Sequence, residues 1–277
     1  MLPEPDPDQE PLLAALREAG LRAELLAWDD PAARRPGAFD LCVLRSSWNY
    51  FRAPEAFLAW CTGTAATSRL ANPLPFVRWN LHKRYLLELE AAGVPVVPTV
   101  RLPRGRTADL PALLAGRGWR DVVIKPAVSA ASFLTRRFRP GETAAGQAFL
   151  AELLAERDAL VQPYLPSAEE PGELALVWID GELSHAVRKR ARLAGEDERV
   201  SEAVPIAPAE REVAERTMAV GRARVGLPLL YGRVDLLPDE AGALRVSELE
   251  LIEPSLFLVQ SPPALERLVR AIVREVR

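Results

Sequence analysis

Hydrophobic positions follow two spacings along this chain, and together they predict alternating helices and strands. Helical spacing of apolar residues covers residues 10–19, 54–61, 80–93, 143–157, 208–225 and 263–277. Short apolar runs that are typical of strands cover residues 21–28, 40–46, 94–100, 121–126, 132–138 and 159–165. The first eleven residues are acidic and rich in proline, so they are predicted to be disordered.

Two antiparallel hairpins are predicted in the last third of the chain. In the first, ELALVWI and ELSHAVRKR flank Asp180-Gly181, a pair that is typical of a type I′ turn. In the second, residues 232–237 and 244–252 flank the segment PDEAG. A proline-rich linker follows the first two strands at residues 72–75. The pattern therefore predicts an α/β fold of α+β lobes: an N-terminal α/β lobe at residues 1–75, a central lobe at 76–165 and a C-terminal lobe at 166–277.

Composition excludes several classes of partner. The 277 residues carry a net charge of −3, and 49% are hydrophobic, which is typical of a soluble globular protein without a nucleic-acid or anionic-membrane partner. The two cysteines, Cys42 and Cys61, favour a reduced, cytoplasmic compartment. The two histidines, His82 and His185, are too few for a multi-histidine zinc site. No apolar run approaches the ~18 residues of a membrane-spanning helix, and the start lacks the pattern of a signal peptide.

Lysine is rare in a chain that otherwise uses arginine. Among the 35 basic residues only Lys83, Lys125 and Lys189 are lysines. A position that keeps lysine in this background favours a role for a compact ammonium group over a planar guanidinium. The three lysines are therefore candidate functional residues.

Three carboxylates in the last hairpin form the strongest candidate site. Strand alternation puts Glu248 and Glu250 on one face, and the turn before them can bring Asp235 close to that pair. Oxygen ligands alone select Mg²⁺, with Mn²⁺ as an alternative. A solvated acidic strand face is about equally compatible with the pattern.

Lys125 ends a buried strand and precedes a turn of mostly small residues that includes Ser129 and Ser132. A lysine at that position can reach a phosphate while backbone N–H groups approach it, although an ordinary strand-end lysine fits as well. After a later strand, Gln162-Pro163-Tyr164-Leu165 offers the donors and acceptors that a planar adenine edge needs. Glu173, beyond the next loop, can accept ribose hydroxyls.

Arginines accompany these groups at both ends of the chain. Arg233 lies two residues before Asp235, where it forms a salt bridge or clamps a developing phosphoryl charge. Arg188 and Lys189 lie at the end of the first hairpin. Candidate substrate residues are Arg45, Ser46 and Ser47 after the second predicted strand, and Glu253 and Ser255 after the acidic strand. Arg45 either holds a substrate carboxylate or is tied to a neighbouring acidic residue.

The order of these groups resembles the ATP-grasp ligases, such as D-alanine–D-alanine ligase and bacterial glutathione synthetase. The resemblance runs from about Val77 to the C-terminus and rests on Lys83, Lys125, QPYL, Glu173, Lys189, Arg233-Val-Asp235 and Glu248-Leu-Glu250. Four segments are more similar still to the subgroup around the D-cycloserine cyclo-ligase: RSSWNY, WNLHKRYL, IKPAVSAAS and SELELIEPSLF.

The resemblance implies a role for each residue. Phosphate would be bound by Lys83 and Lys125, adenine by Gln162, Tyr164 and Leu165, ribose by Glu173, and the nucleotide also by Lys189, Ser129 and Ser132. Mg²⁺ would be held by Asp235, Glu248 and Glu250, with Arg233 and Arg188 as the catalytic cations. Two features depart from the family: Glu250 stands where asparagine is common, and the phosphate loop lacks its usual glycines.

The resemblance also implies an activity. It predicts an ATP- and Mg²⁺-dependent carboxylate–amine ligase that acts through an acylphosphate on a small amino-acid-like substrate, with small-molecule carboxylates and amines as partners. A cyclo-ligase that closes a ring on an O-substituted amino acid, a non-catalytic ATP-binding regulator and a small-molecule kinase are the alternatives. The oligomeric state stays open, with a homodimer as one option.

Overall fold

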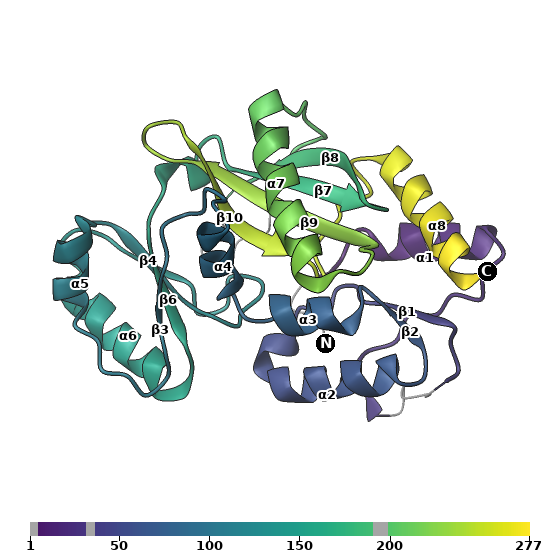
Figure 1. The fold of residues 1–277 in the computed structure, drawn as a ribbon, viewed down its shortest axis with the longest axis horizontal. Helices are drawn as coiled ribbons and strands as arrows, with labels where there is room; N and C mark the ends of the chain where they lie inside the picture. The colour runs from purple at the N-terminus through teal and green to yellow at the C-terminus, as the bar shows by residue number, and fades with distance from the viewer. Residues whose placement is uncertain (1–4, 32–36, 191–198) are drawn as a thin grey trace.

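The computed structural model describes residues 5–31, 37–190 and 199–277, and its strands form three separate sheets (Figure 1). The sheets draw their strands from residues 41–71, 100–163 and 173–250, in the chain order that the predicted lobes require. The mixed helix and strand content confirms the predicted α/β class, while the boundaries of the lobes stay a prediction. Within the described residues, no helix is long and apolar enough to cross a membrane.

The first sheet contains two parallel strands. β1 (Leu41–Val43) pairs with β2 (Arg69–Ala71), and η2 (Tyr50–Arg52) and α2 (Pro54–Ala65) connect them. The strand predicted at residues 21–28 is wrong: this stretch forms no ladder, and among the described residues β1 pairs with β2, which follows α2. Leu25 and Leu26 in that stretch are 49% and 40% exposed.

The N-terminal segment is ordered from residue 5, contrary to the predicted disorder, and residues 1–4 lie outside the described part. Asp6 and Asp8 are buried directly before α1 (Gln9–Glu18). The Asp8 carboxylate accepts hydrogen bonds from the backbone N–H groups of Leu256 at 3.2 Å and Leu258 at 2.7 Å. These bonds, together with packing of α1 on α8 (Pro262–Val276), explain why this proline-rich segment is fixed (Figure 1).

The helix predicted at residues 80–93 forms only in its second half, as α4 (Tyr85–Ala91). A separate helix, α3 (Leu74–Asn80), ends where the predicted helix was expected to begin, and a turn joins the two. The break lets the buried Asn80 amide bridge two backbone groups of the C-terminal segment: it donates to the Leu249 carbonyl at 2.8 Å and accepts from the Leu251 N–H at 2.8 Å.

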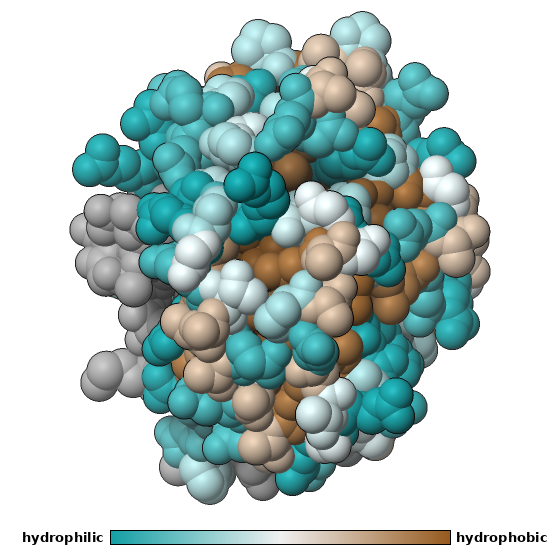
Figure 2. Space-filling view, turned by 90° about the vertical axis from the view of Figure 1, so that its left-hand side faces the viewer, coloured by the Kyte–Doolittle hydropathy of each residue, from teal (hydrophilic) through white to brown (hydrophobic). Residues whose placement is uncertain are grey.

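The second sheet is antiparallel throughout, with strands in the order β3-β6-β4-β5. Its members are β3 (Val100–Leu102), β4 (Val122–Pro126), β5 (Arg136–Phe138) and β6 (Ala159–Pro163), and α5 (Leu110–Arg117) and α6 (Thr143–Glu156) pack on it. Ile124, Leu150 and Val161 are fully buried between sheet and helices. Seen from this end of the molecule, hydrophilic residues surround a more hydrophobic middle (Figure 2).

The third sheet has the strand order β10-β9-β7-β8 and carries the two predicted hairpins. β7 (Glu173–Ile179) and β8 (Glu182–Lys189) meet at Asp180 and Gly181, whose φ angles of 57° and 80° fit a type I′ turn. The second hairpin joins β9 (Tyr231–Pro238) and β10 (Leu244–Glu250). α7 (Pro208–Val225) covers one face through Met218, and η3 (Pro166–Ala168) precedes the sheet.

Asn72 ties the N-terminal lobe to the third sheet. Its fully buried amide donates to the carbonyls of Tyr231 and Leu251, both at 2.8 Å, and accepts from the N–H of Leu230 at 2.8 Å. Three backbone groups near the ends of β9 and β10 therefore depend on one side chain.

Replacing this amide should destabilise the protein. We expect Asn72→Ala to lower the free energy of unfolding by about 3 kcal/mol, because it leaves buried backbone groups without partners. The melting temperature should then fall by roughly 6–12 °C. Gln260→Ala is the control, since the Gln260 side chain forms no hydrogen bond within the described residues. Equal melting temperatures of the two variants in a calorimetric scan would contradict this role.

Candidate active site

A β-bulge in the last hairpin brings the predicted acidic residues onto one face. Val246 pairs with Leu236, but Glu248 pairs with Asp235 and Glu250 with Arg233, so the register shifts by one residue between them. Without this shift Glu248 and Glu250 would lie on the opposite face from Asp235. We call the face that carries Asp235 the site face.

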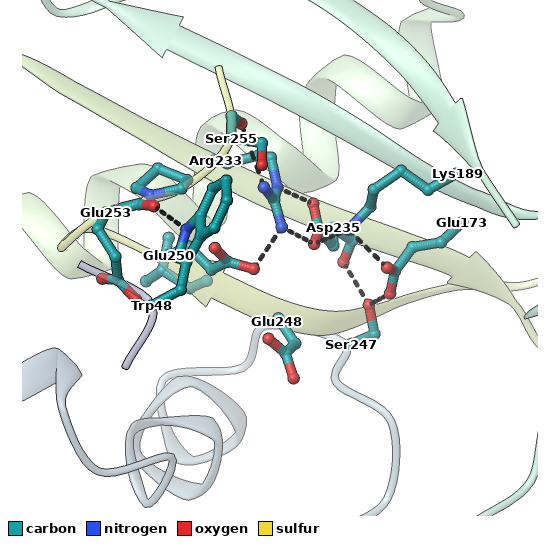
Figure 3. A network of polar contacts seen from close by, with 12 residues as sticks. Trp48, Glu173, Lys189, Arg233, Asp235, Ser247, Glu248, Glu250, Glu253 and Ser255 are labelled. Atoms are coloured by element: carbon teal, nitrogen blue, oxygen red, sulfur yellow. Dashed lines mark hydrogen bonds and ion pairs between the residues drawn. The ribbon is translucent and has the colours of Figure 1, made fainter. Parts of the chain in front are cut away.

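Asp235 lies at the centre of the site face and is 1% exposed. Arg233 donates to it through Nε at 2.7 Å and Nη2 at 2.8 Å, and the Lys189 ammonium lies 2.7 Å away (Figure 3). Burial alone would raise the pKa of Asp235, but the Arg233 and Lys189 cations outweigh it and hold the pKa below its usual range. The same carboxylate raises the pKa of Lys189 against the effects of burial and Arg233.

Glu173 and Ser247 extend this network toward β7. The Lys189 ammonium lies 2.9 Å from Glu173, and the Ser247 hydroxyl donates to Glu173. Glu173 was predicted to take ribose, and here its carboxylate belongs to the network around Lys189.

Glu248 connects the third sheet with groups from outside it. Its carboxylate lies 3.2 Å from the Lys83 ammonium and 3.1 Å from the Lys125 ammonium. Lys83 follows α3, and Lys125 projects from β4 of the second sheet. Burial would raise the pKa of Glu248, but the two lysines lower it strongly. All three lysines of the chain thus contact carboxylates of the site face.

Glu250 is the third acidic residue, and its environment differs. The Arg233 guanidinium donates to its carboxylate, and yet burial and the nearby charges of Asp235 and Glu248 raise the pKa of Glu250 to about 7. A neutral carboxyl group at this position relieves repulsion among the three acids.

The carboxylates suit a divalent metal by chemistry, but they do not converge on one point. Within the described residues, no three carboxylate, imidazole or thiol side chains are placed to hold one ion. Glu248 points away from the Arg233–Asp235 pair, and each acid contacts a protein cation instead (Figure 3). Asp235 and Glu248 share one rung of the ladder and Glu250 lies two rungs further along the same face, and such carboxylate oxygens are the ligands that Mg²⁺ prefers.

The predicted adenine segment lies at the end of β6. Gln162 is buried and donates to the Thr99 hydroxyl at 2.8 Å, and Leu165 is buried against Val97 and Leu237. The Tyr164 ring lies 3.4 Å from the guanidinium carbon of Arg137, and its hydroxyl bonds to Glu169.

The predicted phosphate turn follows β4. Ser129 is buried and its hydroxyl donates to the Pro126 carbonyl at 3.3 Å, whereas Ser132 is exposed. Ala131 and Ser132 have φ angles of 48° and 54°, a conformation that favours glycine. The turn thus adopts a left-handed backbone despite having no glycine.

Arg45 is not free to bind a substrate carboxylate. Its guanidinium lies 3.4 Å from Asp6 and 3.6 Å from Asp8, and it donates to the Pro254 carbonyl at 2.5 Å. Of the two roles predicted for Arg45, the structure supports the ion pair with neighbouring acidic residues and not the binding of a substrate carboxylate. Ser46 likewise donates to Asp6.

Two other predicted substrate residues, Glu253 and Ser255, contact residues of the site with their backbone carbonyl groups. Ser255 accepts a hydrogen bond from Arg233 through its carbonyl at 3.1 Å, and Glu253 accepts one from the Trp48 indole at 2.8 Å (Figure 3). The carboxyl group of Glu253 and the hydroxyl of Ser47 are both buried.

The structure does not bring Arg188 to this cluster. Neighbouring residues of a strand point to opposite faces, so Arg188 lies on the α7 side, 3.6 Å from Glu210, while Lys189 lies on the site face. Arg233 alone among the two predicted catalytic arginines contacts the acids.

Sequence reasoning missed Ser247, Trp48 and the aspartates of the N-terminal segment. Ser247 sits in the bulge, and no local pattern shows that it reaches Glu173. An aromatic side chain such as that of Trp48 is typical of a packing residue, but its buried indole N–H also needs a partner and finds it in the Glu253 carbonyl. Asp6 and Asp8 lie in a segment whose composition favours disorder.

A family model, a curated relative and a solved structure all relate this chain to the same protein, DcsG. Residues 1–72 match the model for the N-terminal domain of D-cycloserine synthetase DcsG. The cycloserine biosynthesis protein DcsG of Streptomyces lavendulae is 35% identical, over 98% of this chain and 95% of that protein. The crystal structure of D-cycloserine synthetase DcsG superposes with a TM-score of 0.89, again at 35% identity and with 98% and 95% of the two chains covered.

More distant structures share the fold. The ATP-grasp ligase PsnB complexed with minimal precursor, Mg and ADP has a TM-score of 0.65 at 19% identity, with 98% of this chain and 96% of that chain covered. D-alanine–D-alanine ligase from Bacillus anthracis complexed with ATP has a TM-score of 0.60 at 14% identity, with 86% and 79% covered. The resemblance stated from the sequence is confirmed, and this chain belongs to the DcsG subgroup of the ATP-grasp ligases, which are ATP-dependent enzymes.

Proposed function

We propose that this enzyme closes a five-membered ring on an O-substituted D-serine, the reaction that a cycloserine synthetase performs. The supporting observation is the 35% identity to DcsG over 98% of the chain, together with the buried acid–cation network on the site face. The proposal therefore takes the cyclo-ligase, which was an alternative in the sequence analysis, over the general carboxylate–amine ligase. The presence of Arg233, Asp235, Glu248 and Glu250 together argues against a regulator that only holds nucleotide, since binding alone would not need all four.

Lysines and acids of the network would exchange partners when nucleotide binds. Lys83, Lys125 and Lys189 would turn from carboxylates to phosphate oxygens, and Asp235, Glu248 and Glu250 would hold Mg²⁺. Bound Mg²⁺ would neutralise charge on the transferring phosphoryl group. Four protein cations face four acidic side chains in the network, so phosphate groups and Mg²⁺ would each meet side chains of opposite charge when the partners exchange.

The chemistry requires activation of a carboxylate, whose own leaving group would be oxide. The substrate carboxylate oxygen would bond to the γ-phosphorus as the bond from that phosphorus to the bridging oxygen breaks, which releases ADP. The terminal nitrogen of the substrate would then attack the acyl carbon, lose a proton and displace phosphate. Arg233, fixed by Asp235 and the Ser255 carbonyl, is placed to stabilise the charge that develops.

Substrate-dependent release of ADP tests this function. O-amino-D-serine, the hydrolytically opened form of cycloserine, and its N-acylated derivatives should each be tested with Mg-ATP. We expect ADP, phosphate and the cyclic product in equal amounts from at least one of them, without any second amine. ADP that forms only with an added amine would indicate an intermolecular ligase, and a stable phosphorylated product would indicate a kinase.

Lys189 and Arg188 offer a matched pair of variants on opposite faces of β8. Lys189→Met should lower kcat/KM by at least about 100-fold, because an ammonium that binds phosphate in the transition state is lost. Arg188→Met should stay within about threefold of the parent enzyme, since its partner is Glu210 of α7. If kcat/KM fell by a similar factor in both variants while their melting temperatures stayed unchanged, the result would contradict the placement of Lys189 on the site face and of Arg188 on the opposite face.

Glu250 should make Mg²⁺ binding depend on pH. A ligating carboxylate must lose its proton, and the pKa of Glu250 is raised to about 7, so affinity should rise as the pH rises through 7. Between pH 6.5 and pH 8 the deprotonated fraction increases about fourfold. Titration of Mg²⁺ in the presence of a non-hydrolysable ATP analogue measures this.

Glu250→Asn is the matched control. It places the common family residue at this position, and any titration of the phosphates of the ATP analogue is the same in both proteins. The additional pH dependence should disappear in this variant. If Mg²⁺ affinity depended on pH in the same way in the parent enzyme and in Glu250→Asn, the dependence would come from the nucleotide phosphates and not from Glu250.

A further inference from the structure

We propose that the Glu253 carboxylate binds the α-ammonium group of the amino-acid substrate. The inference rests on the proposed function, because it assigns one end of the substrate in the same site. It makes Glu253 the residue that distinguishes an amino acid from a simple carboxylic acid.

In the part of the chain that the structure describes, Glu253 differs from Asp235, Glu248 and Glu250 in having no ion pair with a lysine or an arginine. Its side chain is buried, at 6% exposure, and within the described residues no side chain donates a hydrogen bond or forms an ion pair with its carboxyl group. Asp235, Glu248 and Glu250 each contact a lysine or an arginine. A carboxylate buried without a counter-charge is costly and is retained where function needs it.

The cations nearest to Glu253 are already in use. Lys83 and Arg233 act on it electrostatically, but they are bound to Glu248 and Asp235. Burial raises the pKa of Glu253 most and the charge of Glu250 adds to it, and together they outweigh the charges of Lys83 and Arg233. An ammonium group supplied by the substrate would add positive charge there.

The loop of the N-terminal lobe beside Glu253 contributes one hydrogen bond and, within the described residues, one buried hydroxyl without a partner. The Trp48 indole holds the Glu253 carbonyl at 2.8 Å, and the Glu253 side chain lies on the Trp48 side of the site, apart from the Arg233–Asp235 pair (Figure 3). Ser47, the preceding residue, has a buried hydroxyl that finds no hydrogen-bond partner in the described chain. Tyr50 follows on the same loop, and Glu253 is the charge that raises its pKa most after burial.

The geometry fits an α-amino acid in one orientation. Arg233 and Lys189 lie beside Asp235 on one side of the site, where the substrate carboxylate would meet phosphate, and Glu253 lies on the other side, three residues beyond Glu250 (Figure 3). In an α-amino acid one carbon carries both the carboxylate and the ammonium group. A substrate that reaches Arg233 with its carboxylate can therefore place its ammonium group toward Glu253.

A pair of substrates that differ only in the ammonium group tests this proposal. The pair is O-amino-D-serine and 3-(aminooxy)propanoic acid, and binding is measured by calorimetry with Mg²⁺ and AMP-PNP present, so that no turnover is needed. The parent enzyme should bind O-amino-D-serine about 30- to 100-fold more tightly, as expected for a hydrogen-bonded charge pair. Glu253→Gln should reduce this preference to about threefold or less and leave AMP-PNP affinity unchanged.

Two further variants exclude a purely structural effect. Glu253→Asp keeps the charge and should keep part of the preference, whereas Arg188→Met should keep all of it. Equal losses for both compounds in Glu253→Gln, or a parent enzyme that binds the two equally or binds neither, would overturn the proposal. Selective binding without ring closure would instead refute the proposed function and leave the role of Glu253 intact.

Discussion

Glu248 takes two ammonium groups that come from outside its own sheet, Lys83 at 3.2 Å and Lys125 at 3.1 Å. Removing one partner of a buried ion pair typically costs about 3–5 kcal/mol, because the other charge is left in a medium that solvates it poorly. This contact therefore helps to hold β4 of the second sheet against β10 of the third. The phosphates of a nucleotide would draw on the same ammonium groups, so the contact that joins the sheets is the one that a ligand would replace.

The contact depends on the bulge at Ser247. A single extra residue in β10 turns Glu248 and Glu250 to the site face and lets the Ser247 hydroxyl reach Glu173. The bulge also keeps the apolar residues of β10 buried, because Val246 before it and Leu249 after it both pack in the core under α7. The bulge thus reconciles a buried apolar face with a buried charged face on one short strand.

The sequence predicts the elements of this fold better than their long-range contacts. Asp180-Gly181 specifies its hairpin locally, and α7 follows helical spacing over its whole length. The predicted strand at residues 21–28 fails because apolar spacing alone does not reveal that β1 pairs with a later segment. Arg45 was equally compatible with a substrate and with an acidic neighbour, and only the tertiary structure shows Asp6 and Asp8 beside it. The acids of the site could be named from their order, but not the cation that each one contacts.

The loop after β10 is held from several directions. Arg45 and Trp48 bind its carbonyls at Pro254 and Glu253, and Asp8 accepts from its amides at Leu256 and Leu258. These contacts fix the backbone of the loop on both sides of Glu253, and a backbone fixed in advance would lower the entropy lost if a substrate binds there.

A substrate held by its ammonium at this loop and activated at its carboxylate near Arg233 would be fixed at one carbon. Its remaining arm, which carries the nucleophilic nitrogen, would be the part left to rotate. Attack within the same molecule gains effective concentrations of up to about 10⁵–10⁸ M when the reacting atoms are well oriented. Under the proposed function, a substrate fixed at one end would need no second binding site for another amino acid, which would agree with Arg45 being bound to Pro254 instead of to a substrate carboxylate.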